Sequence, residues 1–229
     1  MVPLRANQMS VPVITIDGPG GSGKGTIAMR LAQNLGWHYL DSGALYRIVA
    51  VAAMERAIEA DNEQALGELA RHLEFSFSFT GDEVVILMDG IRITPKLRSE
   101  EAGVFASNIA AVPAVRAALV KRQRAFRKRP GLVADGRDMG TVIFPDAKLK
   151  IFLTANVKAR TDRRHKQLKE KGENVNLSRL FRDIEKRDKR DRSRSISPLT
   201  PAPDAQLIDS TEMSIEMVLN EIHKLLEIN

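Results

Sequence analysis

The hydrophobic and polar positions along the chain predict short strands that alternate with helices. Residues 13–16 are β-branched and almost continuously apolar, which is typical of a strand covered on both faces in a parallel sheet. Further runs with strand character lie at 37–40, 132–134, 150–153 and 206–208. Helical spacing predicts helices over 27–35, 44–60, 62–73, 99–111, 114–129, 157–171, 177–191 and 214–227. The pattern therefore predicts an α/β fold with a five-stranded parallel sheet flanked by helices.

A different pattern interrupts this alternation in the first half of the chain. Phenylalanine and serine alternate strictly over 75–79, and two short apolar runs follow at 84–88 and 91–94 after tight-turn sequences. Three short strands joined by tight turns are typical of an antiparallel meander. A meander does not fit easily into a parallel sheet, so we expect a small inserted substructure that Pro95 closes.

Composition narrows the class of protein. With 229 residues, 43% of them hydrophobic, the chain is long enough for a full core. It contains no cysteine, which excludes disulfides and thiolate metal sites and suits the reducing cytoplasm, where we expect the protein. No apolar run approaches the roughly 20 residues of a membrane span, so we expect no membrane partner. Residues 1–10 lack the apolar core of a signal peptide and are predicted to be a flexible tail.

The positive charge of the chain is concentrated in one segment. Residues 158–194 hold 15 Lys and Arg against 7 Asp and Glu, a balance of +8, whereas the whole chain carries +6. Such a segment faces solvent or an acidic ligand. Its acidic residues are interleaved with the basic ones, and Phe181 is its only aromatic residue for base stacking, so we expect no nucleic-acid partner.

A glycine-rich stretch between the first strand and the first helix predicts a phosphate-binding loop. It fits the Gly-x-x-x-x-Gly-Lys pattern in its usual strand–loop–helix context. Glycines let backbone N–H groups converge on one anion, and Lys24 adds a charge for the β and γ phosphates. We expect the whole stretch to bind ATP: Gly18, Pro19, Gly20, Gly21, Ser22, Gly23, Lys24, Gly25 and Thr26.

The magnesium ligand of this loop is left open by the sequence. Gly25 stands where Ser or Thr usually holds Mg²⁺, and the hydroxyl of Thr26 comes one place later. Three carboxylates are predicted to lie near the loop, and because Mg²⁺ keeps several of its waters, any of them can hold it indirectly. These candidates are Asp17, Asp41 and Asp135.

Two further polar segments follow predicted strands. Residues 41–47 read Asp-Ser-Gly-Ala-Leu-Tyr-Arg, and residues 135–141 read Asp-Gly-Arg-Asp-Met-Gly-Thr. Ligands in open α/β sheets gather at the carboxyl ends of the strands, so we expect Arg47 and Arg137 to converge there. Guanidinium groups suit phosphate because they can donate two parallel hydrogen bonds to it.

These motifs, followed by the basic run over 187–194, resemble those of the bacterial cytidylate kinases, in the same order and from Pro12 onward. The resemblance includes the three-stranded insertion and implies a nucleoside monophosphate kinase with the P-loop kinase fold. It implies in-line phosphoryl transfer from ATP to CMP or dCMP with Mg²⁺, and we expect a monomer. The implied domains are a core of 11–41 and 117–229, a monophosphate-binding insertion of 42–116, and a short helical lid of 158–195.

The resemblance also implies roles for individual residues. Lys24, Arg187 and Arg194 act on the transferring phosphoryl group, and Arg47 and Arg137 on the acceptor phosphate. Cytosine carries an amino group that uracil lacks, and a carboxylate is its natural acceptor. The resemblance gives this role to Asp138 with Ser107, while Arg116 donates to the ring and Asp191 meets the ribose. The implied CMP-binding set is Ser42, Arg47, Ser107, Arg116, Arg137, Asp138, Arg187 and Asp191.

The last basic helix has two interpretations that apply to different faces. Arg187, Asp191 and Arg194 stand at i, i+4 and i+7, which places them on one face. Its other faces suit a solvated helix with the ion pairs Asp183–Arg187, Glu185–Lys189 and Asp188–Arg192. The basic residues of the preceding helix are interpreted as surface beside the lid: Arg160, Arg163, Arg164 and Lys166.

Two other functions remain as alternatives. One is a P-loop kinase of another small molecule, such as UMP, shikimate or a sugar acid, which a substrate panel separates. The other is a nucleic-acid-binding ATPase, suggested by the basic run near Arg194. A salt-dependent shift of RNA mobility at submicromolar protein would support it.

Overall fold

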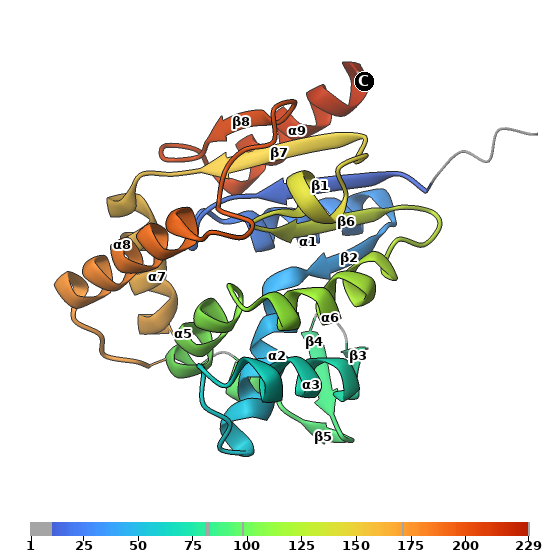
Figure 1. Cartoon of the computed structure of the whole chain (residues 1–229). Coiled ribbons are helices and arrows are strands. Elements are labelled where there is room, and N and C mark those ends of the chain that lie inside the picture. The colour runs from blue at the N-terminus through green and yellow to red at the C-terminus, as the bar shows by residue number, and fades with distance from the viewer. Residues whose placement is uncertain (1–10, 81–82, 98, 171, 229) are drawn as a thin grey trace, which may run out of the picture.

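The computed structural model describes residues 11–80, 83–97, 99–170 and 172–228, so the predicted tail of residues 1–10 lies outside it. A parallel sheet has the strand order β2-β6-β1-β7-β8, which confirms the predicted five-stranded sheet (Figure 1). The strands are β1 (Val13–Asp17), β2 (His38–Asp41), β6 (Leu132–Gly136), β7 (Leu149–Thr154) and β8 (Gln206–Asp209).

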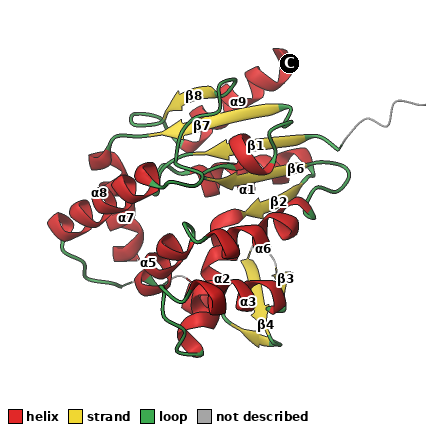
Figure 2. Ribbon diagram, viewed as in Figure 1, coloured by secondary structure: helices red, strands yellow, loops and turns green. Residues whose placement is uncertain are grey.

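Helices cover both faces of this sheet, because its strands are apolar on both sides (Figure 2). On β1, Val13 packs into one buried cluster, whereas Ile14 and Ile16 pack into the other. The cluster around Ile14 is shared with α1 (Lys24–Leu35) and α9 (Ile215–Ile228). The cluster around Val13 is shared with α2 (Ser42–Glu55), α3 (Glu63–His72), α5 (Glu100–Ile109) and α6 (Pro113–Arg124).

The predicted meander is present as an antiparallel sheet of β3 (Phe75–Thr80), β4 (Glu83–Met88) and β5 (Ile91–Arg92). In Figure 1 it lies beside α2 and α3, apart from the parallel sheet. The third strand is shorter than the predicted 91–94, because Thr94 begins the short helix α4 (Thr94–Leu97). The side-chain oxygen of Thr94 accepts a hydrogen bond from the backbone N of Ile86 at 2.9 Å.

The largest other differences from the sequence prediction concern two helix ends and one additional turn. Helix α2 ends at Glu55 instead of residue 60, and the chain then turns through Ala57, which has a φ of 50°. Helix α6 ends at Arg124 instead of residue 129. Beyond it, Arg127 Nε donates to the carbonyl oxygen of Val11 at 2.7 Å. A π-helical turn, η1 (Met139–Ile143), follows β6, where the pattern predicts no element.

Two basic helices, α7 (Val157–Glu170) and α8 (Leu177–Ser193), pack against each other beyond the carboxyl ends of the strands (Figure 1). The loop between β1 and α1, the start of α2 and the segment between β6 and η1 begin at the same edge of the sheet. The parallel topology therefore brings the predicted polar motifs together.

Within the described residues no single helix has the length and apolar character that a membrane span requires. Helices α5 and α6 meet that test only as a pair, and they are bent by 101° relative to each other. Both contribute to a buried cluster, through Ala102 and Ile109 of α5 and Val115 and Leu119 of α6.

Candidate active site

The loop between β1 and α1 surrounds the N-terminus of α1. Gly18 has no room for a side chain, because a Cβ atom there would overlap the carbonyl oxygen of Leu153 on β7. Lys24 is the first residue of α1, and its Nζ donates to the carbonyl oxygen of Pro19 at 3.3 Å. The free N–H groups and the positive dipole end of α1 add to this ammonium charge. The loop therefore has the geometry of a phosphate site.

The electrostatics of the loop are complementary to an anion. Burial, followed by the charge of Arg137, lowers the pKa of Lys24 far below its ordinary value. Burial, followed by the charge of Asp41, raises the pKa of Asp135. Burial also lowers the pKa of Arg187 to about 9, with Arg137 acting in the same direction. A phosphate placed among these groups favours the charged forms of Lys24 and Arg187.

The residues beside the loop fit a magnesium ion. Asp41 and Asp135 lie opposite each other on β2 and β6. A Cβ atom on Gly25 would lie 3.8 Å from Asp135 Oδ2 and 3.8 Å from the Tyr39 hydroxyl, so a carboxylate adjoins the position that usually carries the metal-binding hydroxyl. The described residues contain no cluster of three or more metal-ligating side chains. This donor set suits Mg²⁺ held by phosphates and water with one or two carboxylates.

The remaining candidate carboxylate, Asp17, is committed to the backbone. It is buried at the end of β1 and accepts hydrogen bonds from the N–H of Met139 at 2.9 Å and of Gly140 at 2.8 Å. These bonds fix the start of η1, directly after Asp138. Sequence reasoning could not find this role, because both donors are backbone groups of an element that the pattern does not predict.

We expect Asp17 to make the protein less stable as the pH rises from about 4 to about 6. Burial raises the pKa of Asp17 from 3.8 to about 6, so in this window the folded state holds a proton that the unfolded chain has released. The free energy of unfolding should fall by about 3 kcal/mol across the window, at about 1.4 kcal/mol per pKa unit. Urea unfolding of the wild type and of Asp17→Asn isolates this effect, because the variant lacks the titration. Parallel pH profiles for the two proteins would contradict it.

Arg116 and Asp138 form a buried ion pair that lines the cleft. Arg116 Nη1 also donates to the carbonyl oxygen of Ala110 at 3.1 Å. Tyr46 of α2 lines the same region, and burial raises the pKa of its hydroxyl to about 12, although the charge of Arg116 acts in the opposite direction. A guanidinium and a carboxylate are thus held side by side, and they offer a base edge a donor and an acceptor, respectively.

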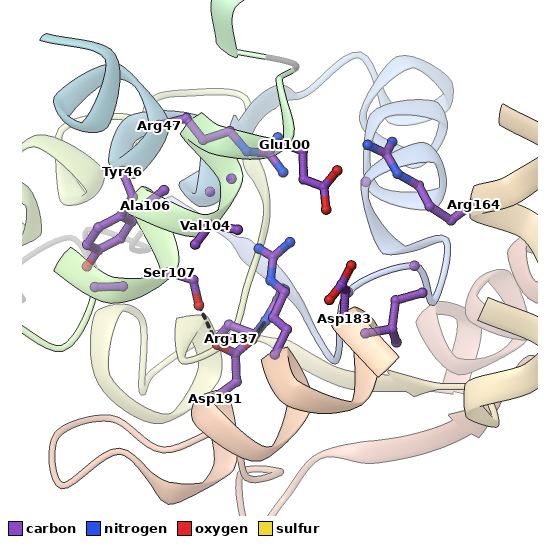
Figure 3. Close-up of a pocket in the computed structure, with 18 of the residues that line it drawn as sticks. Tyr46, Arg47, Glu100, Val104, Ala106, Ser107, Arg137, Arg164, Asp183 and Asp191 are labelled. Atoms are coloured by element: carbon purple, nitrogen blue, oxygen red, sulfur yellow. Dashed lines mark hydrogen bonds and ion pairs between the residues drawn. The ribbon is translucent and has the colours of Figure 1, made fainter. Parts of the chain in front are cut away.

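Asp191 of α8 joins three segments of the chain. Its Oδ2 accepts from Arg137 Nε at 2.8 Å, and its Oδ1 accepts from Arg194 Nη2 at 2.5 Å and from Ser107 Oγ at 3.4 Å. Figure 3 shows the contact between Ser107 and Asp191 beside Arg137. Burial would raise the pKa of Asp191, but the charges of Arg137 and Arg194 outweigh it and hold the pKa below its usual value. Asp191 therefore remains an anion.

These groups border one cavity of about 1070 Å³ between the loop, α2, α5, α7 and α8. In Figure 3 the guanidinium groups of Arg47 and Arg137 point into it. The predicted site residues that line it are Gly20, Gly21, Lys24, Gly25, Ser42, Arg47, Ser107, Arg116, Arg137, Asp138, Arg187, Asp191 and Arg194. The other predicted loop residues belong to the loop but not to the cavity wall: Gly18, Pro19, Ser22, Gly23 and Thr26.

Two predicted site residues have contacts that the sequence does not predict. Ser107, which shares with Asp138 the implied role of reading the base, contacts Asp191 and Arg194, whereas Asp138 contacts Arg116. Arg194 is expected on the face of the last basic helix, but α8 ends at Ser193 and Arg194 has extended backbone angles. Its guanidinium still reaches Asp191, because the chain turns back toward the cavity.

The prediction of ion pairs on the outer faces of α8 is wrong. Among the described residues, Asp183 pairs with Arg179 at 3.7 Å, and Asp188 pairs with Arg160 of α7 at 2.5 Å. Within the part of the chain that the structure describes, no ion pair joins Asp183 to Arg187, Asp188 to Arg192 or Glu185 to Lys189. The prediction that Arg160 belongs to the surface beside the lid is wrong as well, because Arg160 is buried in the contact between α7 and α8.

The buried Gln123 is a site residue that sequence reasoning missed. Its Oε1 accepts a hydrogen bond from Ser42 Oγ at 2.9 Å and so orients a predicted CMP-binding side chain. Its Nε2 and the Tyr46 hydroxyl are both buried without a hydrogen-bond partner in the described chain. Gln123 lies in the last turn of α6 outside any motif, so only its burial on a helix rich in charged residues could have singled it out.

A phosphate loop, a facing arginine-rich cavity and a covering pair of basic helices define the class of nucleoside monophosphate kinases with the P-loop fold. Comparison with known proteins gives the family: a model described as Cytidylate kinase matches residues 14–228. The chain is 56% identical to the cytidylate kinase of Stutzerimonas stutzeri over 93% of both chains. It is 54% identical to that of Photobacterium profundum over 90% of this chain and 91% of the relative. The chain belongs to the cytidylate kinase family.

Solved structures agree on the fold. An uncharacterized protein from Eubacterium ventriosum superposes with a TM-score of 0.52 over 95% of this chain and 99% of that protein, at 14% identity. At this identity the likeness concerns the fold alone. The family membership rests on the sequence matches.

Proposed function

We propose that this protein phosphorylates CMP and dCMP with ATP and Mg²⁺. The observation that carries the proposal is that the Lys24 loop and the Arg116–Asp138 pair line the same cavity, together with several arginines. The loop suits the phosphates of ATP, and the ion pair offers the acceptor that an exocyclic amino group requires. The cytidylate kinases at 51–56% identity support the same substrate class.

In this proposal the protein contributes charge and position, because phosphoryl transfer asks little covalent chemistry of it. An oxygen of the CMP phosphate attacks the γ phosphorus of ATP while the bond to the bridging oxygen breaks and ADP leaves. Arg47 and Arg137 hold the acceptor phosphate, and Lys24, Arg187 and Arg194 offset the charge of the transferring group. Asp191 meets the ribose, and Ser42 and Ser107 complete the CMP site.

Magnesium has a place in the same scheme. Magnesium bound here would supply positive charge that offsets the charge of the ATP phosphates. Asp135 and Asp41 are the side chains that would hold it, through water or directly, since Asp135 lies beside Gly25 and Asp41 lies opposite Asp135 on the neighbouring strand. The Tyr39 hydroxyl donates to Asp135 Oδ1 at 2.9 Å and so orients this carboxylate.

A substrate panel tests the proposal directly. ADP release is followed with ATP and Mg²⁺ in the presence of CMP, dCMP, UMP, AMP, shikimate or gluconate. The expected result is that CMP and dCMP have the highest kcat/KM. Faster turnover of shikimate or gluconate, or turnover that needs RNA, would reject the proposal in favour of one of the alternatives.

Replacement of Arg194 by alanine should lower kcat much more than it lowers the melting temperature. Its guanidinium donates hydrogen bonds to Asp191 and to the Ser107 carbonyl oxygen at the cavity wall. When Arg194 is lost, Asp191 keeps Arg137 as a partner. We expect about a 100-fold loss in kcat, as for removal of one charge-stabilising group. Steady-state kinetics and thermal melting check this, and a large melting loss with little change in kcat would contradict it.

Three further statements remain predictions from the sequence. These are the division into a core, a monophosphate-binding insertion and a lid, the monomeric state, and the cytoplasmic location. The described chain is consistent with the division in that α7 and α8 form one wall of the cavity and α5 another. Sedimentation of the full chain with and without nucleotides checks the monomeric state.

A further inference from the structure

Arg160 of α7 connects three parts of the molecule. Its Nη1 donates to Asp188 Oδ1 of α8 at 3.0 Å, and its Nη2 donates to Asp188 Oδ2 at 2.5 Å, so the pair is two-pronged. The same Nη1 donates to the carbonyl oxygen of Gly20 in the phosphate loop at 3.0 Å. Its Nε donates to the carbonyl oxygen of Ala155, just after β7, at 2.9 Å. Arg160 is only 1% exposed, so none of these bonds competes with bulk water.

The phosphate loop packs directly on the base of α7. Gly21 has a φ of 79°, and a Cβ atom there would lie 3.2 Å from Arg160 Cβ. A side chain at this position would crowd α7 against the loop. The contact therefore limits how closely the loop can approach α7.

Arg187, the neighbour of Asp188, depends on this arrangement for its position. Its Nη1 and Cδ lie 3.8 and 3.9 Å from the site of a Cβ atom on Gly20, so its side chain lies against the phosphate loop. Its Nε is buried without a hydrogen-bond partner in the described chain. Since no side-chain hydrogen bond to another described residue directs it, the placement of its guanidinium follows from the placement of α8.

We propose that Arg160 is a positioning residue, which holds Asp188 and the Gly20 carbonyl together so that Arg187 stands over the phosphate loop. This inference rests on the proposed function, because it assigns Arg187 to the transferring phosphoryl group. Asp191 is fixed separately by Arg137 and Arg194. Loss of Arg160 is therefore expected to affect the chemical step while the CMP site persists.

The test replaces the pair by apolar side chains, Arg160→Met with Asp188→Leu, because removing only one partner leaves a buried charge that can unfold the protein. We expect kcat to fall about 10- to 100-fold, as for a misplacement of about 1 Å, with the KM for CMP unchanged within about threefold. Amide hydrogen exchange over residues 185–192, measured without nucleotides, should become faster. The matched control is Lys158→Met with Asp162→Leu, which removes an exposed pair on the same helix and should leave kcat and exchange unchanged.

Arg160→Lys is the second variant, since it keeps the buried positive charge and with it the fold, but loses the two-pronged contact. It should lower kcat in the same direction. A kcat within twofold of the wild type in either folded variant, or a rise in the KM for CMP without a loss of kcat, overturns the inference. Absence of CMP turnover in the wild type would reject the proposed function instead, and the exchange measurement would still decide whether Arg160 fixes α8.

Discussion

Lys24→Ala should lower kcat about 100- to 1000-fold while leaving the protein folded. The ammonium group of Lys24 is buried at the N-terminus of α1, among backbone N–H groups that converge on a phosphate site. In the transition state it offsets charge that develops on the transferring group, and no water can replace it in a closed site. Steady-state kinetics with ATP and CMP measure the loss.

The stability of the same variant gives an independent check. Burial lowers the pKa of Lys24, so the folded state binds this proton less tightly than the unfolded chain does. The charged lysine therefore opposes folding, increasingly so as the pH falls from its unfolded pKa of 10.5 toward its folded pKa of about 7, below which the effect is complete. Lys24→Ala should melt at least as high as the wild type at pH 7. Lys148→Ala, at an exposed position outside the cavity, is the control and should change neither property. Full activity of Lys24→Ala would remove the basis of the proposed function.

Asp138→Ala should cost both stability and selectivity. It leaves the buried guanidinium of Arg116 without its partner, which typically destabilises a protein by about 3–5 kcal/mol. It also removes the acceptor for the cytosine amino group, so the preference for CMP over UMP in kcat/KM should fall about 10- to 100-fold, from about 1–3 kcal/mol for a good base contact. Denaturant unfolding and the two kcat/KM values measure the two effects.

The exposed pair Arg127–Asp146 offers a matched control for this prediction. Its two charged groups are 2.7 Å apart, but the Asp146 side chain is 59% exposed. Exposed pairs contribute only about 0–1 kcal/mol, so Asp146→Ala should change stability little and selectivity not at all. Asp138→Asn adds a second control, because it keeps the shape and removes the charge. If Asp138→Ala and Asp146→Ala have equal effects on stability, the buried pair has no special role; if the CMP to UMP ratio is unchanged, Asp138 does not read the base.

The fold and most of the cavity wall could be predicted because each depends on local patterns. Apolar runs such as 13–16 determine buried strands, and parallel strands bring their carboxyl ends to one edge, so Arg47 and Arg137 had to approach each other. The glycines around Lys24 have a local chemical reason as well. These relationships involve residues close in sequence, or the ends of regular elements.

The contacts that could not be predicted join residues distant in sequence through side chains of common type. Arg160 and Asp188 look like any charged pair of residues on two solvated helices, and only the packing of α7 on the phosphate loop buries them. Asp17 bonds to the backbone of η1, a π-helical turn with no clear sequence signal. Helix ends such as Arg124 depend on where Arg127 finds its carbonyl partner.

The central place of β1 in the sheet bears on how the chain is synthesised. This strand pairs with β6 and β7 only, and Val13 has Leu132 as its partner, more than a hundred residues later. Because β1 leaves the ribosome before β6 and β7, both of its hydrogen-bonding edges stay unpaired until the middle of the chain has been synthesised. The meander between them can fold locally during that interval, because its strands pair with their neighbours in sequence.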